Sequence, residues 1–177
     1  DMIAVADHNS TYHCELTVTL GLEAGITVLR AAEVTSAEDV HSLVILPDEA
    51  SVISFQDWLD LHCTHMPHNP DIFGDQVVID RDENIIREIN YFLPAALNAT
   101  IDEVEEAAHN HGGLFIPAHI DRPAMGIIGQ LGFIPDDLFV DAVEVVGMAG
   151  DLLYPVIRNS DAHMPEHIGR RFTDYML

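Results

Sequence analysis

Lysine is absent from this sequence of 177 residues, so all seven cationic side chains are arginine. They are outnumbered by 30 acidic side chains, which gives a formal net charge of −23 at pH 7. Proteins that bind nucleic acid or anionic membranes usually carry a basic patch that neutralises phosphates. The composition therefore argues against a stand-alone nucleic-acid-binding protein and against docking on a membrane surface.

Cysteine and long apolar runs are also scarce. The two cysteines, Cys14 and Cys63, are too few for a disulfide framework and lack C-x-x-C spacing. No apolar run approaches the roughly 18 residues of a membrane span, and no signal-peptide pattern is present. No G-x-S-x-G, Walker or G-x-G-x-x-G motif occurs either. We therefore expect a cytoplasmic protein without these catalytic or nucleotide-binding signatures.

Apolar residues and histidines are abundant instead. Hydrophobic residues make up 48% of the chain, enough to bury a core and offset the entropy lost on ordering. We expect a single domain over residues 1–177. Eleven histidines among many carboxylates could gather divalent cations, which would offset part of the negative charge.

Short apolar runs alternate with helical patterns, which is typical of an α/β fold with parallel strands. The expected strands cover 3–6, 27–32, 42–46, 114–118, 142–146 and 156–159, and the expected helices cover 11–24, 55–63, 101–111 and 124–131. Thr100 and Glu103 form a capping-box pattern at the start of the third helix. A loop and a β-hairpin over about 64–90 are expected to be an insertion in this domain.

Metal-liganding side chains follow the ends of predicted strands. At the carboxyl ends of parallel barrel strands, such residues share one rim. His41 instead begins a strand, but an antiparallel return of residues 42–46 would bring it to the same rim as Glu33. The predicted ligand set is therefore His8, Glu33, His41, His119, Asp161 and His163. Mixed imidazole and carboxylate ligands suit Zn, Mn or Fe better than Ca or Mg.

These residues stand in motifs that resemble those of the PHP (polymerase and histidinol phosphatase) family. The motifs are Asp7-His8-Asn9, Glu33 with His41, Gly113 through His119, and Ser160-Asp161-Ala162-His163, in the family's order. The resemblance covers nearly the whole chain and is nearest to the stand-alone bacterial metal-dependent phosphoesterases. It implies a distorted (β/α)7 TIM-like barrel that holds two or three divalent metal ions at its C-terminal rim.

The resemblance also implies a role for each metal-binding residue. Glu33 would bridge two ions, and His41 with His119 would complete the site of one of them. Asp161 would bind the other bridged ion.

The remaining motif residues would bind a third ion or act around the metals. His8 and His163 would help to hold the third ion. Asp7 and Asn9 would orient ligands, with Asp7 counted among the catalytic residues. Arg122 would clamp phosphate, because a guanidinium matches phosphate oxygens in a bidentate manner.

The family's first motif, a His-x-His at the end of a first strand, has no counterpart before Asp7. Asp1 already falls at the start of a predicted strand, so we expect a domain that is N-terminally incomplete and lacks its first strand. Such a truncated chain could be inactive.

Three other histidine patterns are weaker candidates for metal sites. His62, His65 and His68 lie in a loop-rich segment without matched spacing. The imidazoles of His109 and His111 would point about 200° apart on a helix. The H-x-x-E-H pattern from His163 to His167 matches a metallopeptidase motif, but Pro165 interrupts the helix that this motif needs.

The sequence thus predicts a phosphoric ester hydrolase in which a metal-activated hydroxide attacks a small phosphomonoester or short nucleotide. Its strong negative charge disfavours long nucleic acid as a partner. Two alternatives stay open: an exonuclease or phosphodiesterase acting on oligonucleotides, and a catalytically degenerate metal-binding regulatory domain.

Overall fold

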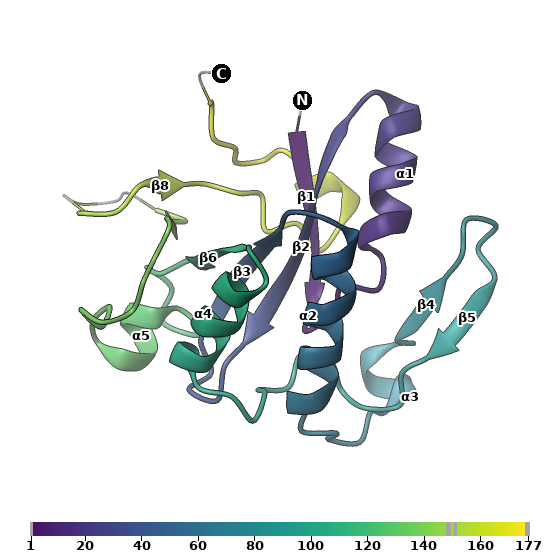
Figure 1. The fold of residues 1–177 in the computed structure, drawn as a ribbon, viewed down its shortest axis with the longest axis horizontal. Helices are drawn as coiled ribbons and strands as arrows, with labels where there is room; N and C mark the ends of the chain where they lie inside the picture. Colours follow the sequence, from purple (N-terminus) through teal and green to yellow (C-terminus); the bar gives the residue numbers. More distant parts are fainter. Residues whose placement is uncertain (1, 148–149, 151, 176–177) are drawn as a thin grey trace.

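The computed structural model describes residues 2–147, 150 and 152–175 of the chain (Figure 1). Asp1, at the start of the first predicted strand, lies outside the described residues. The strands of the described part are β1 (Met2–His8), β2 (Thr27–Thr35), β3 (His41–Leu46), β4 (Val77–Ile79), β5 (Ile85–Glu88), β6 (Leu114–Pro117), β7 (Val143–Glu144) and β8 (Val156–Ile157). Its helices are α1 (Cys14–Ala24), α2 (Glu49–His62), α3 (Pro70–Phe73), α4 (Ile101–Asn110) and α5 (Ile127–Leu131), with a 3₁₀ turn η1 at Pro165–His167.

The main sheet has four strands in the order β1-β2-β3-β6. β1 and β2 are parallel, and His8 is paired with Glu33 at their carboxyl ends. β3 returns antiparallel to β2, with His41 opposite Thr35, as the sequence predicted. β6 is antiparallel to β3 and therefore runs in the direction of β1 and β2. The carboxyl ends of β1, β2 and β6 and the amino end of β3 therefore lie at the same edge of the sheet, and this edge carries the predicted metal ligands.

The expectation of a (β/α)7 TIM-like barrel is wrong. The described residues form a small mixed α/β domain in which the four-stranded sheet and the pairs β4-β5 and β7-β8 are separate, with no closed barrel. One reason is the tight reversal at residues 36–40, where the Ser36 amide bonds the Val40 carbonyl, so that β2 and β3 form a hairpin in place of a βαβ unit. A second reason is that β7 has two residues and pairs in parallel with β8, while the hydrogen bond from Asp141 N to Phe115 O joins the segment before β7 to β6.

Helices α2 and α4 lie side by side against the sheet and cover its core (Figure 1). Phe55, Leu59, Val104 and Phe115 are fully buried there. α2 begins at Glu49, earlier than predicted, because the Asp48 side chain accepts the Ser51 amide. The capping box at the start of α4 is confirmed. No helix among the described residues is long and apolar enough to cross a membrane.

Strands β4 and β5 pair antiparallel in the segment that was expected to be inserted, and they extend from one side of the molecule (Figure 1). The Ile79 amide donates to His13 Nε2 at 3.2 Å, and Arg81 pairs with Glu23 on α1. These contacts attach the hairpin to the α1 side of the sheet.

The imidazole of His109 links α4 to the segment before β7. Because this group titrates near neutral pH, we expect the free energy of unfolding to depend on pH. Burial lowers the pKa of His109, but hydrogen bonds to Asp141 (2.9 Å) and to Glu105 outweigh it and raise the pKa above its ordinary value. The stabilisation is therefore complete below the ordinary imidazole pKa of about 6.5 and is lost as pH rises through the raised value of the folded state.

We expect His109→Gln to lower the free energy of unfolding by up to about 1 kcal/mol at pH 6, since the pair is partly exposed, and by less at pH 9. Urea denaturation of both proteins across this range measures the difference. A difference that stays constant with pH would show that the ionised imidazole contributes nothing.

Candidate metal centre

All six predicted ligands and Arg122 line one pocket of about 320 Å³. It lies at the sheet edge where β1 and β2 end and β3 begins. Its remaining walls are apolar or aromatic and come from Phe92, Pro94 and Met125. Residues far apart in the sequence are thus brought together as the predicted strand directions require.

Glu33 stands at the centre of this pocket with an imidazole on several sides. Its Oε1 lies 3.2 Å from His41 Nδ1 and 3.4 Å from His119 Nε2. Its Oε2 lies 3.5 Å from His8 Nδ1. One ligand atom from each of His8, Glu33 and His41 can be chosen so that all lie within 4.8 Å of one another. This spacing suits a single cation bound by mixed imidazole and carboxylate ligands.

The backbone explains how these side chains meet. His8 and Glu33 are register partners on adjacent parallel strands, so their side chains lie on the same face of the sheet. The Ala118 amide bonds the His41 carbonyl at 2.9 Å and brings the next residue, His119, beside the start of β3. The rings of His41 and His119 are 5.3 Å apart, and those of His8 and His41 are 5.4 Å apart.

The pocket keeps its carboxylate charged and one of its imidazoles neutral. Burial alone would raise the pKa of Glu33, but hydrogen bonds to His119 and His41 outweigh it and hold that pKa well below its usual range. Burial lowers the pKa of His8, and this outweighs the attraction to Glu33. A neutral imidazole and an ionised carboxylate are the protonation states that bind divalent metals.

Asp161 and His163 form the second half of the pocket. His163 Nδ1 lies 3.6 Å from Asp161 Oδ1, and the His163 ring is 6.1 Å from that of His8. Arg122 Nη2 donates to Asp161 Oδ2. The side chain of His163 is 64% exposed, against 12% for Asp161, so this half opens towards solvent.

Asp7 and Asn9, which flank His8 in the first predicted motif, are not among the residues that line the pocket. Asp7 precedes His8 on β1 and faces the opposite side of the sheet, where its carboxylate pairs with His13 Nδ1 at 3.0 Å. The structure therefore places it outside the residues that line the pocket. Asn9 is fully buried, and it joins the ends of β1 and β2 to the segment that carries Phe92 and Pro94.

The donor set fits a divalent cation. Nδ1 of His8, the ring nitrogen that faces Glu33, is buried and has no hydrogen-bond partner. An unpaired buried polar atom costs free energy, and coordination is one way to satisfy it. His8, Glu33 and His41 could hold one ion, with His119 Nε2 3.4 Å from the same Glu33 carboxylate, and Asp161 with His163 could contribute to a second.

Sequence reasoning missed Glu144, which is 3% exposed and whose carboxylate accepts the His119 amide at 3.2 Å. Burial raises the pKa of this carboxyl group, and the His119 amide opposes that effect. The available signal was an acidic residue inside the otherwise apolar predicted strand 142–146. The apolar pocket wall from Phe92, Pro94 and Met125 had no comparable signal.

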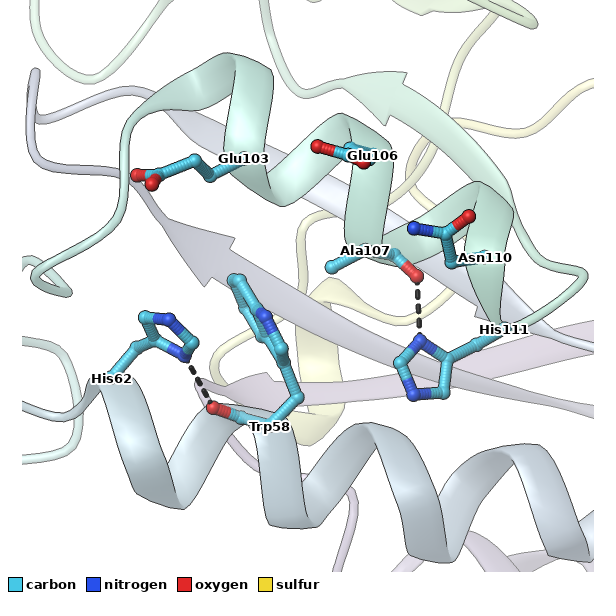
Figure 2. A pocket seen from close by; sticks show the side chains of 7 residues that line it. All are labelled: Trp58, His62, Glu103, Glu106, Ala107, Asn110 and His111. Atoms are coloured by element: carbon cyan, nitrogen blue, oxygen red, sulfur yellow. Dashed lines mark hydrogen bonds between the residues drawn. The ribbon is translucent and has the colours of Figure 1, made fainter.

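The weaker histidine patterns have structural roles in the described residues. Figure 2 shows a second pocket, of about 240 Å³, between α2 and α4. His62 Nδ1 bonds the Trp58 carbonyl at 2.7 Å, and His111 Nδ1 bonds the Ala107 carbonyl at 2.6 Å (Figure 2). The H-x-x-E-H segment forms only the short turn η1, so the helix that a metallopeptidase motif needs is not formed there.

Comparison with known proteins places this arrangement in a known fold. Endonuclease Q in complex with a 27-mer duplex carrying an abasic lesion superposes with a TM-score of 0.65 at 19% identity, over 96% of this chain and 43% of that one. The lesion-specific endonuclease PfuEndoQ from Pyrococcus furiosus gives 0.55 at 23% identity, over 82% and 34%. A candidate metal-dependent phosphoesterase from Bifidobacterium adolescentis gives 0.61 at 18% identity, over 97% and 81%. These likenesses show the fold.

Among curated proteins, YqxK of Bacillus subtilis, an uncharacterised protein, is 28% identical over 149 residues. The match covers 76% of this chain but 32% of YqxK, so the chain spans about a third of that relative and of PfuEndoQ. No protein-family model matches the sequence.

Proposed function

We propose that this chain is a metal-dependent phosphoesterase of the PHP type, acting on a small phosphomonoester or short nucleotide. The observation that carries the proposal is the convergence of His8, Glu33, His41 and His119 in one pocket that also contains Arg122. Glu33 provides the negative charge, and the three imidazoles surround it. The fold shared with an endonuclease and a candidate phosphoesterase supports the same reaction class.

A divalent cation bound here would supply Lewis-acid chemistry: it would polarise a phosphoryl oxygen and lower the pKa of water, so that water can act as a nucleophile at neutral pH. The chain's own residues bind the cation and orient the groups around it. His8, Glu33, His41 and His119 hold the cation site, while Asp161 and His163 face it from the open half. The apolar wall of Phe92, Pro94 and Met125 limits access of bulk water from its side.

Arg122 binds the substrate phosphate in this proposal. One of its N–H groups is engaged by Asp161, which fixes the guanidinium at the pocket while other donors remain for phosphate oxygens. We expect Arg122→Gln to raise KM by about 10- to 100-fold, because a charge-assisted hydrogen bond contributes roughly 1.5–3 kcal/mol. Steady-state kinetics on a phosphomonoester measures this change.

Arg81→Gln is the matched control, because it removes the same charge from the exposed hairpin pair with Glu23. An equal rise in KM in both variants would indicate a loss of overall charge and not of a phosphate contact.

A nuclease is the second candidate, favoured by the likeness to endonuclease Q in complex with duplex DNA. The net charge of −23 opposes DNA binding by this chain alone. Because the chain spans 43% of that neighbour, DNA contacts would have to come from other parts of a longer protein. Salt dependence separates the two: an oligonucleotide substrate gives a steep loss of affinity with salt, and a small phosphomonoester a shallow one.

The test combines metal analysis with a substrate panel. The chain is loaded with Zn²⁺ or Mn²⁺ and then dialysed into metal-free buffer. We expect it to retain at least one ion and to hydrolyse a phosphomonoester, with the hydrolysis abolished by a chelator. Retention of metal without hydrolysis of any phosphomonoester or oligonucleotide would instead support a degenerate metal-binding domain. Absence of retained metal would refute the proposal.

A further inference from the structure

Glu144 is a buried carboxylate with no role in the proposed ligand set. It belongs to β7, is 3% exposed and is not among the residues that line the pocket. Among the described residues, no arginine or histidine forms an ion pair with it, and its carboxylate accepts a hydrogen bond from the His119 amide. Burying a carboxylate is unfavourable unless its interactions offset the lost hydration. An apolar residue would pack in β7 at lower cost, so the carboxylate calls for another explanation.

Glu144 holds the chain at His119 by two adjacent bonds. Its side-chain Oε2 accepts a hydrogen bond from the main-chain amide of His119 at 3.2 Å. Its main-chain carbonyl accepts one from the amide of Ile120 at 2.9 Å. Asp121 makes the reciprocal contacts, accepting the amides of Val146 and Gly147 at 2.8 and 2.7 Å. The turn after β6 is therefore fixed to the end of β7 from both sides.

The backbone at His119 needs such support. Its φ of +31° lies in the left-handed region, which is unfavourable for a residue with a Cβ. This conformation directs the His119 ring into the pocket, with Nε2 3.4 Å from Glu33 Oε1. Relaxation of the turn to a common conformation would move the ring away from Glu33.

We infer that Glu144 is a positioning residue, whose carboxylate holds the His119 main chain so that the imidazole can bind the metal. The inference rests on the proposed function, because it concerns metal affinity at the same site. Glu144 acts through the His119 amide and not as a ligand. Removing a group that orients a ligand typically costs 10- to 100-fold in metal affinity.

Cobalt(II) titration of the purified chain tests the inference, with calorimetry for affinity and visible absorption for coordination. We expect Glu144→Ala to weaken Co²⁺ binding about 10- to 100-fold and to alter the absorption bands. Glu144→Gln should stay within about threefold of the original affinity, because its amide oxygen accepts the same main-chain hydrogen bond. Glu144→Asp keeps the charge but moves the acceptor oxygen away from the His119 amide, so it is expected to weaken binding as much as Glu144→Ala. If Glu144→Ala fails to fold, Glu144→Asp takes its place in the test.

Asp141→Ala is the matched structural control. Asp141 accepts the amide of Phe115 at 2.8 Å, a carboxylate-to-backbone bond at the other end of β6. It should lower the thermal midpoint but leave the Co²⁺ affinity unchanged.

Three results would overturn the inference. Equal losses of affinity in Glu144→Ala and Asp141→Ala would indicate general destabilisation. Equal losses in the alanine and glutamine variants would identify Glu144 as a ligand. Unchanged affinity in both the alanine and the aspartate variant would exclude any role in metal binding. Failure of the unmodified chain to bind Co²⁺ is a different outcome and would refute the proposed function itself.

Discussion

Changing Glu33 to Gln is expected to abolish tight metal binding and to lower phosphoester hydrolysis by at least about 100-fold. The carboxylate faces His8, His41 and His119, and its pKa is held well below the usual range, so it carries the negative charge of the pocket. An amide of the same shape has no charge to balance a divalent cation. Metal content after dialysis and initial hydrolysis rates measure the two effects.

Glu23→Gln is the control for this substitution, because Glu23 is 48% exposed and pairs with Arg81 outside the pocket. It should leave metal content and rate unchanged. We expect Glu33→Gln to remain folded, since glutamine retains the size and hydrogen-bonding capacity of the original side chain. A folded Glu33→Gln protein that keeps its metal would show that the carboxylate is not a ligand.

Changing Asn9 to Ala is expected to lower the free energy of unfolding by about 2–4 kcal/mol. The fully buried Asn9 amide donates to the Leu93 and Ala95 carbonyls at 2.7 and 2.9 Å, and its carbonyl accepts the Thr35 amide at 2.9 Å. Alanine would leave these backbone groups unpaired and would adopt the observed φ of +46° less readily than asparagine. Urea denaturation measures the loss.

Two further variants separate the causes of this loss. Asn9→Gly relieves the positive φ but not the missing hydrogen bonds, so it should recover only the conformational part of the loss, about 1 kcal/mol. Asn9→Asp keeps the acceptor for Thr35 but turns an oxygen towards two carbonyls, and should destabilise at least as much as alanine. An alanine variant within about 0.5 kcal/mol of the original would show that this network contributes little.

The sheet edge of the site could be predicted because it depends on local rules. Strand alternation and an antiparallel return are sufficient to bring His41 to the same edge as Glu33, and the structure has this arrangement. The capping box at Thr100 is equally local, since both of its hydrogen bonds lie within four residues.

Whether the strands close into a barrel could not be predicted, because closure depends on pairings between distant strands that no local pattern specifies. β7 has only two residues, and its ladder is with β8 and not with β6. The strand pattern over 142–146 contains the two residues of β7 but overestimated its length, and it carried no information on its partner. The resemblance supplied the closed barrel, and the described strand pairing contradicts it.

Asp7 and Glu144 show the same limit within the site. The carboxylate of Asp7 follows the opposite face of β1 and pairs with His13, which itself accepts a bond from the inserted hairpin. Glu144 matters through the backbone of a turn 25 residues earlier in the chain. Neither contact can be read from the spacing of residue types.

The position of a bound cation tests the central claim most directly. Crystals of the chain grown with Mn²⁺ or Zn²⁺ should show an anomalous difference peak between Glu33, His8, His41 and His119, with Arg122 facing it across the pocket. The same crystals of Glu33→Gln should lack this peak. A peak instead at His62, His65 or His68, or no peak at Glu33 in crystals of the unmodified chain, would contradict the account.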